Sequence, residues 1–324
     1  MKSKIDTLFI AAFGGPTPGC CKRFDPCPGE AYCFVSGVFG FNEARKARVD
    51  EVAGHYKELG GYSKFNEITE KQAAALKSEL ARRGTKLDVR LGYYHWNPYI
   101  IPRVEEMARA GSKSFVSLVL APHQSSLSWD AYLRRIAEGL EALPSGVKKP
   151  EWKGVADPFF DKPGFIEALA DNTCKAAAKI GADFAAGDTG VLFSVHTIPM
   201  AVAKTSPYLE QVRKTADLLA EKLGSKLTRI GFQSRPTDSR IEWTSPSLEN
   251  AIGDLVKAGA KKIVACAIGF LCDNVEVLYD MGIEGAQVAK KLGVKFAAAE
   301  AVNDHPAFIA ALADQVEAAI SKAP

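Results

Sequence analysis

Short apolar segments rich in β-branched residues alternate along the chain with amphipathic segments, and this alternation constrains the fold more than any other sequence feature. The apolar segments have the length of single strands and span residues 8–13, 87–93, 115–120, 191–195, 227–232, 262–270 and 294–298. The amphipathic segments carry apolar residues at three-to-four spacing, typical of helices, and span residues 67–83, 103–110, 129–143, 163–180, 207–223 and 247–258. Strands that are apolar on both faces and separated by helices predict parallel sheets covered on both sides, so we expect an α/β fold.

The chain of 324 residues is long enough for two domains of about 150 residues each, and its two halves resemble one another. In each half an early apolar segment ends in a proline-containing turn, at residues 14–16 and 196–199, and a later apolar segment leads into a helix. We therefore predict two similar doubly wound, Rossmann-like domains, an N-terminal one over residues 1–170 and a C-terminal one over residues 171–324.

Composition and charge exclude several classes of protein. The 41 basic and 38 acidic residues give a net charge of +3, too even a balance for a nucleic-acid-binding surface. No apolar run approaches the ~20 residues that span a bilayer, and the first apolar run is too short for a signal peptide. Seven cysteines, an odd number in a chain of this length, favour a reducing compartment. We expect a cytoplasmic protein that is soluble or at most peripheral to a membrane.

Ligands of doubly wound sheets bind beyond the carboxyl ends of the strands, and this rule selects the residues with a candidate function. The segments that directly follow predicted strands are residues 14–16, His95, residues 123–128, His196 and residues 272–276. His196 is the most informative of these, because a histidine near a carboxylate can both ligate a divalent metal and accept a proton near neutral pH. The alternative is a histidine with a purely structural role.

Glu276, Asp280 and Glu284 are spaced four residues apart, so in a helix they form one acidic row along a single face. No lysine or arginine between Asp273 and Glu284 neutralises them. Like charges at this spacing repel, and a bound cation would explain the row. The alternative is a solvated acidic face, which the position of Glu276 close to a strand end disfavours.

The chain resembles the ferrochelatases, enzymes of haem biosynthesis that insert ferrous iron into a porphyrin. The resemblance runs from Leu8 to about Ala313 and rests on five segments that occur in family order. They are Gly-Gly-Tyr-Ser at 60–63 with Asn-Glu-Ile-Thr at 66–69, Leu-Ala-Pro-His-Gln-Ser-Ser at 120–126, Ser-Val-His-Thr-Ile-Pro at 194–199, Gln-Ser-Arg at 233–235 with Trp243, and Asp-Asn-Val-Glu-Val-Leu-Tyr at 273–279.

The resemblance implies a chelatase-like fold with an active-site cleft between two domains and with ferrous iron as a substrate. It implies that His196 takes the pyrrole protons and that Glu276 steers metal or protons at the opposite edge of the site. Asp280 and Glu284 would extend that edge into a path for hydrated iron, so all four side chains are expected to meet the metal. The expected porphyrin-binding residues are Phe13, Ser63, His95, His123, Tyr132 and Trp243.

The chain departs from the family pattern at three places. Asn274 stands where the family has a histidine, Lys64 stands where a proline is usual, and Phe13 replaces a tyrosine that ligates the product iron in some coproporphyrin-using members. Residues 92–98 and 121–123 nevertheless look more like that branch. The substrate is therefore left open between protoporphyrin IX and coproporphyrin III. Two other functions remain as alternatives: a cobalt or nickel chelatase for another tetrapyrrole, and a non-catalytic tetrapyrrole carrier.

Cys20, Cys21, Cys27 and Cys33 lie within fourteen residues of a loop rich in proline and glycine. Reduced thiols are the default interpretation, and an iron–sulfur cluster or a zinc ion is the alternative, because thiolates suit both. The aromatic, uncharged segment 32–41 follows. We favour a buried segment there over an apolar lip that contacts a membrane.

Overall fold

The computed structural model describes residues 5–19, 25–236 and 240–323. Contacts divide the chain into two compact units. The first comprises Met1–Leu120, Ser128–Pro158 and Leu312–Pro324, and the second comprises Ala121–Leu127 and Phe159–Ala311. This division differs from a single break at residue 170, because a short segment after the third strand belongs to the second unit and the C-terminal residues belong to the first.

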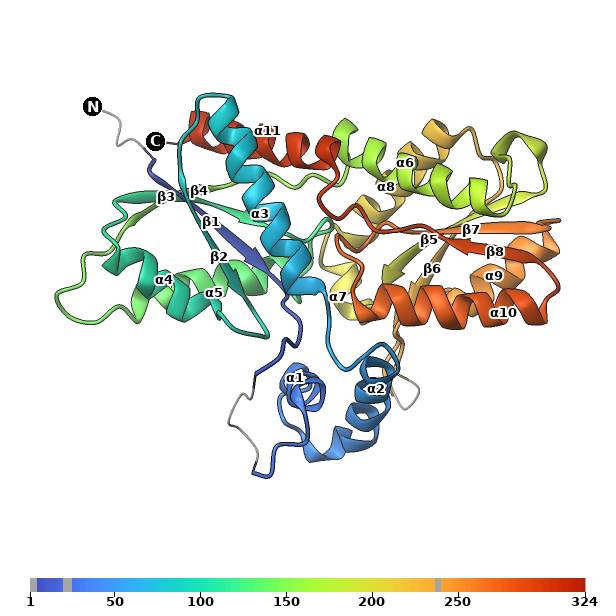
Figure 1. Ribbon diagram of the computed structural model, residues 1–324, viewed down its shortest axis with the longest axis horizontal. Coiled ribbons are helices and arrows are strands. Elements are labelled where there is room, and N and C mark those ends of the chain that lie inside the picture. Colours follow the sequence, from blue (N-terminus) through green and yellow to red (C-terminus); the bar gives the residue numbers. More distant parts are fainter. Residues whose placement is uncertain (1–4, 20–24, 237–239, 324) are drawn as a thin grey trace. The chain divides into compact units, whose positions relative to one another are not determined.

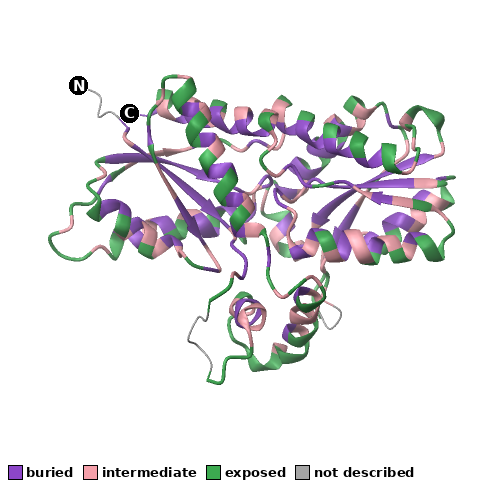
Figure 2. Cartoon of the chain, viewed as in Figure 1, coloured by how far each residue is buried: buried purple, intermediate pink, exposed green. Residues whose placement is uncertain are grey.

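The first unit is built on a parallel sheet with the strand order β2-β1-β3-β4. Its strands are β1 (Thr7–Ala12), β2 (Asp88–Tyr93), β3 (Ser114–Val119) and β4 (Glu151–Val155). Its helices are α1 (Glu30–Val38), η1 (Glu43–Arg45), α2 (Lys46–Glu58), α3 (Phe65–Arg82), α4 (Ile100–Arg109) and α5 (Trp129–Glu141). All six residues of β1 and of β3 are buried, because the two central strands are covered on both faces (Figure 2).

The second unit repeats this topology with the strand order β6-β5-β7-β8, again all parallel. Its strands are β5 (Thr189–His196), β6 (Thr228–Gln233), β7 (Lys262–Ala267) and β8 (Lys295–Ala298). Its helices are α6 (Pro163–Lys179), η2 (Phe184–Ala186), α7 (Met200–Lys204), α8 (Tyr208–Leu223), α9 (Leu248–Lys257), the π-helix η3 (Val277–Glu284) and α10 (Gly285–Lys291). Figure 1 shows α9 and α10 side by side on one face of this sheet and α6 and α8 on the other face. Each sheet thus has its first strand in second place, as expected for two similar halves.

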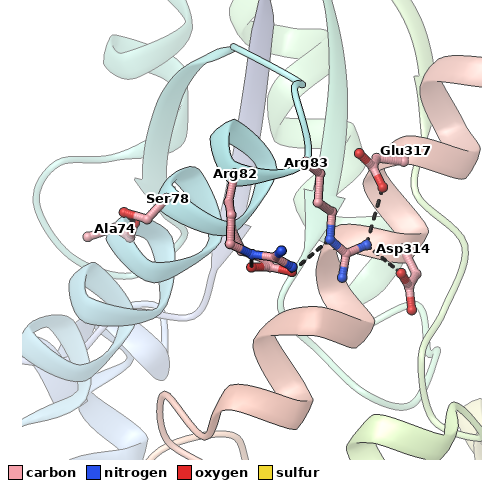
Figure 3. A network of polar contacts seen from close by, with 7 residues as sticks. Ala74, Ser78, Arg82, Arg83, Asp314 and Glu317 are labelled. Carbon is pink, nitrogen blue, oxygen red and sulfur yellow. Dashed lines mark hydrogen bonds and ion pairs between the residues drawn. The ribbon is translucent and has the colours of Figure 1, made fainter.

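The last helix, α11 (Pro306–Lys322), begins in the second unit and ends in the first. Its beginning packs through Phe308 against Phe159 and Phe165. Its end is tied to the end of α3 by Arg83, whose Nη1 lies 2.5 Å from Asp314 Oδ1 and 3.2 Å from Glu317 Oε2 (Figure 3). This ion-pair network attaches the C-terminal residues to the first unit.

The predicted α/β class is confirmed, and each segment predicted as a strand contains one. The strand β4 was not predicted, because its sequence Glu-Trp-Lys-Gly-Val is exposed or only half-buried at the edge of the sheet and shows no apolar run. The segment 32–41 lies mostly in α1, which buries Cys33, Phe34 and Val35. Within the described residues, no helix combines the length and the apolar character needed to cross a bilayer.

Candidate functional site

His196 is the last residue of β5, the strand that lies between β6 and β7. The residues before it are buried, whereas 44% of its own side chain is exposed, as expected at the carboxyl end of a central strand. Its Nδ1 lies 2.5 Å from the carbonyl oxygen of Thr197. A carbonyl only accepts hydrogen bonds, so Nδ1 carries the proton and the lone pair of the neutral ring is on Nε2.

Glu276 lies in the helical run that begins at Val275 and continues as η3. The Oδ1 of Asn274 accepts a hydrogen bond of 2.9 Å from the backbone N–H of Val277, three residues on, which is the geometry of a helix N-cap. Glu276 is therefore in the first turn, where the helix dipole favours a negative charge. Asn274, which replaces the family's histidine, begins the helix that carries Glu276. The strand β7 ends at Ala267, so Glu276 follows a loop and not the strand itself.

The structure brings the two side chains together: His196 Nε2 lies 3.6 Å from Glu276 Oε2. Gln233, at the end of β6, links both elements, because its Nε2 donates to the carbonyl oxygen of Glu276 at 3.1 Å and its Oε1 accepts from the hydroxyl of Ser194. The ends of β5 and β6 and the start of η3 thus form one hydrogen-bonded unit. The pair offers a divalent ion one imidazole and one carboxylate and leaves most of its coordination sphere open.

The acidic row is not a uniformly solvated face. Glu276 is half-buried, Asp280 is 8% exposed and Glu284 is exposed. Burial, followed by the negative charges of Glu276 and Glu284, raises the pKa of Asp280 to about 7, against the opposing effect of the hydroxyl of Ser234, which lies 2.5 Å from Asp280 Oδ2. Near neutral pH, Asp280 is therefore protonated in part of the molecules. Among the described residues, no group of three or more His, Cys, Asp and Glu side chains is arranged to hold a metal ion.

An aromatic cluster lies at the corresponding end of the first sheet. The ring of Phe13 packs against His95 and Phe34, with centroids 4.6 and 6.1 Å apart, and Tyr94 packs against Tyr132 at 5.4 Å. The backbone N–H of His95 donates to the carbonyl of Phe13 at 2.9 Å. Burial, followed by the charge of Arg135, lowers the pKa of His95 to about 4, so its ring is neutral at physiological pH.

The turn after β1 requires glycine. Gly14 has a φ of +93°, and a Cβ there would meet Tyr93 Cβ at 2.9 Å. Ser63 lies beside this turn: its backbone N–H donates to the carbonyl of Pro16 at 3.1 Å, and its hydroxyl accepts from the N–H of Phe65 at the start of α3. Ser63 thus fixes the loop that carries the first of the family-like segments.

The remaining predicted site residues lie in several places. Trp243, in the second unit, is half-buried and pairs through its backbone with Pro199, just after His196. His123 is 2% exposed inside the second unit, where burial lowers its pKa to about 3. Cys27 is exposed and Cys33 is buried on α1. Cys20 and Cys21 lie outside the described residues.

Sequence reasoning did not predict the roles of two residues of this site. Ser234 bonds Asp280, and its backbone φ of +64° is a feature that the sequence does not reveal. Tyr208, the first residue of α8, donates from its hydroxyl to the carbonyl oxygen of His196 at 2.7 Å. No spacing pattern connects Tyr208 with a strand end twelve residues earlier.

Comparison with known proteins identifies the family to which the chain belongs. The model of the ferrochelatase family matches residues 44–320. A ferrochelatase of Deinococcus radiodurans is 31% identical over 315 residues, which cover 97% of this chain and 95% of the relative. The coproporphyrin III ferrochelatase 2 of Bacillus cereus is 32% identical over 320 residues, covering 98% and 95%. The solved structure of SirB from Bacillus subtilis with Fe³⁺ shares the fold at a TM-score of 0.58 and 13% identity, covering 98% and 96%. The chain belongs to the ferrochelatase family.

Proposed function

We propose that this protein inserts ferrous iron into a porphyrin in haem biosynthesis, with His196 and Glu276 as its catalytic pair. The observation that carries the proposal is the 3.6 Å approach of His196 Nε2 to Glu276 Oε2 at the carboxyl end of β5. Metal insertion releases two protons from the pyrrole nitrogens for each iron bound, so the reaction needs both a proton acceptor and an open metal site. A carrier that only binds the ring needs neither.

His196 serves as the proton acceptor in this proposal. Because its Nδ1–H is held by the carbonyl of Thr197, the lone pair on Nε2 is available to a pyrrole proton. The imidazolium that forms then has the carboxylate of Glu276 as its neighbour, and this opposite charge stabilises it. The neutral tautomer needs no rearrangement before the next turnover once the proton has left.

The row Glu276, Asp280 and Glu284 serves as the path for hydrated iron and for departing protons. Exposed Glu284 meets solvent. Buried Asp280, whose pKa is raised to about 7 by burial and by the neighbouring carboxylates, releases a proton when a cation approaches. Glu276 completes the row beside His196. The row thus becomes more negative when a cation approaches. When no cation is present, protonated Asp280 is not an unpaired buried charge.

In the first unit, apolar contacts to the macrocycle are assigned to Phe13 and His95, with Ser63 fixing the loop beside Gly14, and Tyr132, which is 3% exposed, is assigned a supporting place behind Tyr94. In the second unit, Trp243 is the residue assigned to the macrocycle. The neutral ring of His95 suits an apolar ligand. Phe13 offers no oxygen to ligate the product iron, so release of metallated porphyrin does not require a phenolate to dissociate. His123, being buried, is assigned a supporting place behind the second unit's site.

The test is an anaerobic assay with ferrous iron and either protoporphyrin IX or coproporphyrin III, in which the absorbance of the porphyrin measures the rate of metal insertion. We expect turnover that Glu276→Gln reduces strongly and that the control variant His55→Gln, on α2, leaves unchanged. Ring binding without turnover in the wild type would favour the carrier. Turnover confined to cobalt or nickel and a non-porphyrin tetrapyrrole would favour the other chelatase.

The thiols of the cysteine loop are proposed to be reduced, which agrees with a cytoplasmic location. Iron, zinc and sulfide analysis of protein purified without oxygen tests this directly. Stoichiometric zinc, or iron with sulfide, that is lost in a Cys27→Ser variant would instead establish a metal site in the loop.

A further inference from the structure

Among the described residues, the carbonyl oxygen of His196 has no strand partner on the β7 side. The β5–β7 ladder ends at Ser194 and Ala267, whereas the β5–β6 ladder continues to His196 and Gln233. The hydroxyl of Tyr208 supplies the missing donor at 2.7 Å. A side chain from α8 thus completes the hydrogen bonding of β5 at the residue that carries the imidazole.

Tyr208 is itself held rigidly. It is 6% exposed, and its ring meets the ring of His123 edge-on, with centroids 5.9 Å apart and planes at 87°. Burial raises the pKa of its phenol, so the hydroxyl keeps the proton that it donates. Residues 208, 211 and 215 share one face of α8, and each is buried and hydrogen-bonded.

The proton positions in this support can be assigned from the contacts. The hydroxyl of Thr215 has one proton and lies 2.8 Å from the carbonyl of Phe160 and 3.1 Å from that of Gln211, both of which only accept. Thr215 must therefore accept from His123 Nε2, 3.0 Å away. His123 is a neutral ring with its proton on Nε2, and it presents a fixed edge to Tyr208.

The backbone position of His196 determines where its imidazole lies, because the ring is held to the adjacent carbonyl of Thr197. A displacement of about 1 Å in a reacting group can cost up to about a hundredfold in rate. We propose that Tyr208 is a positioning residue that acts through the carbonyl of His196 and keeps Nε2 directed toward Glu276. This inference rests on the proposed role of His196 as the proton acceptor.

The experiment compares Tyr208→Phe, which removes only the hydroxyl, with Thr173→Val. Thr173 is also buried in the second unit, and its hydroxyl also donates to a carbonyl, that of Leu169 at 2.7 Å, so the control loses a similar hydrogen bond elsewhere. We expect Tyr208→Phe to lower kcat about five- to tenfold, the effect of one hydrogen bond, with unchanged KM for iron and porphyrin. Thr173→Val should leave kcat unchanged.

A second readout needs no turnover. In ligand-free protein with ¹⁵N-labelled histidine, the imidazole signals of the five histidines can be assigned by single variants. We expect wild-type His196 to show the tautomer protonated at Nδ1, and Tyr208→Phe to shift it toward a mixture of tautomers, with Thr173→Val unchanged. An unchanged His196 spectrum and an unchanged kcat in Tyr208→Phe would overturn the positioning role.

The two proposals fail in distinguishable ways. If His196→Ala kept full activity, the proposed base would be wrong, whereas the spectrum of His196 would still report whether Tyr208 orders it. If Tyr208→Phe does not fold, Thr215→Val tests the same support by removing the partner of His123. The same change in the His196 spectrum, with about a threefold loss of kcat, is expected there, and an unaltered spectrum would contradict the proposal.

Discussion

The two sheets have the same strand order, yet the residues at the ends of their corresponding strands differ in chemistry. The strand β1 ends at a glycine turn beside Phe13, His95 and other aromatic rings, whereas β5 ends at His196 beside Glu276. The imidazole in the first unit packs among aromatic rings and is neutral, and the one in the second unit is 44% exposed with a carboxylate neighbour. One topology therefore supports an apolar surface in one unit and a charged pair in the other, because strand ends can vary without changing the sheet.

This contrast predicts that the largest kinetic effect arises in the second unit. His196→Ala should lower kcat about a hundredfold or more, the usual contribution of a proton acceptor, with little change in porphyrin binding. Because 44% of the side chain is exposed, the melting temperature should move by no more than about 2 °C. Steady-state rates together with calorimetry measure both quantities. A folded variant with the wild-type rate would remove the basis for the contrast.

Substitutions in the first unit should instead change the KM for porphyrin. Phe13→Ala removes a ring that packs against Phe34, Phe65 and His95, and it should weaken porphyrin binding about tenfold, with kcat changed much less. Fluorescence titration of the metal-free porphyrin measures the affinity directly. A loss confined to kcat would show that the aromatic cluster takes part in the chemical step and not in binding.

The pH dependence of the free energy of unfolding tests whether Asp280 in the acidic row is a buried acid. Its pKa is raised from 3.8 to about 7, so between these values the folded protein holds a proton that the unfolded chain has lost. Stability should therefore fall as pH rises from about 4 to 7, by roughly 2–4 kcal/mol from this one group. Asp280→Asn should lose that slope, whereas Glu284→Gln, at an exposed position, should keep it.

The same two variants distinguish the effect of the buried acid Asp280 on the KM for iron from the effect of the exposed charge of Glu284. Asp280→Asn should raise the KM for iron about three- to tenfold and abolish its fall with pH near 7, because the variant has no proton to release. Glu284→Gln should raise that KM only about twofold, and added salt should hide the effect, since exposed charges are screened. Urea titrations and initial rates at several pH values measure both effects. Equal slopes of stability in the wild type and in Asp280→Asn would argue against a buried acid.

Much of this arrangement could be predicted from the sequence, since buried parallel strands are apolar runs and ligand sites lie at their carboxyl ends. That reasoning selected His196, the last residue of β5, and Glu276, which lies in the helical run that follows the loop after β7. It could not reveal that η3 is a π-helix, whose hydrogen bonds span five residues. Nor could it reveal that Asp280 is buried and bonded to Ser234 while Glu284 is exposed. It also could not connect Tyr208 with His196, because the contact depends on how α8 packs.

The smallest expected effect concerns how the C-terminal helix joins the first unit. Arg83 bonds Glu79 on α3 and both Asp314 and Glu317 on α11 (Figure 3). Neighbouring Arg82 bonds Glu79 and is largely exposed. Arg83→Ala should lower the free energy of unfolding by about 1 kcal/mol and Arg82→Ala by clearly less, because exposed ion pairs contribute little singly and more in a network. Neither variant should alter kcat, since neither side chain belongs to the proposed site. Denaturant titrations that gave equal losses for the two arginines would mean that the pairs across to α11 add no stability, and that apolar packing alone holds this helix to the first unit.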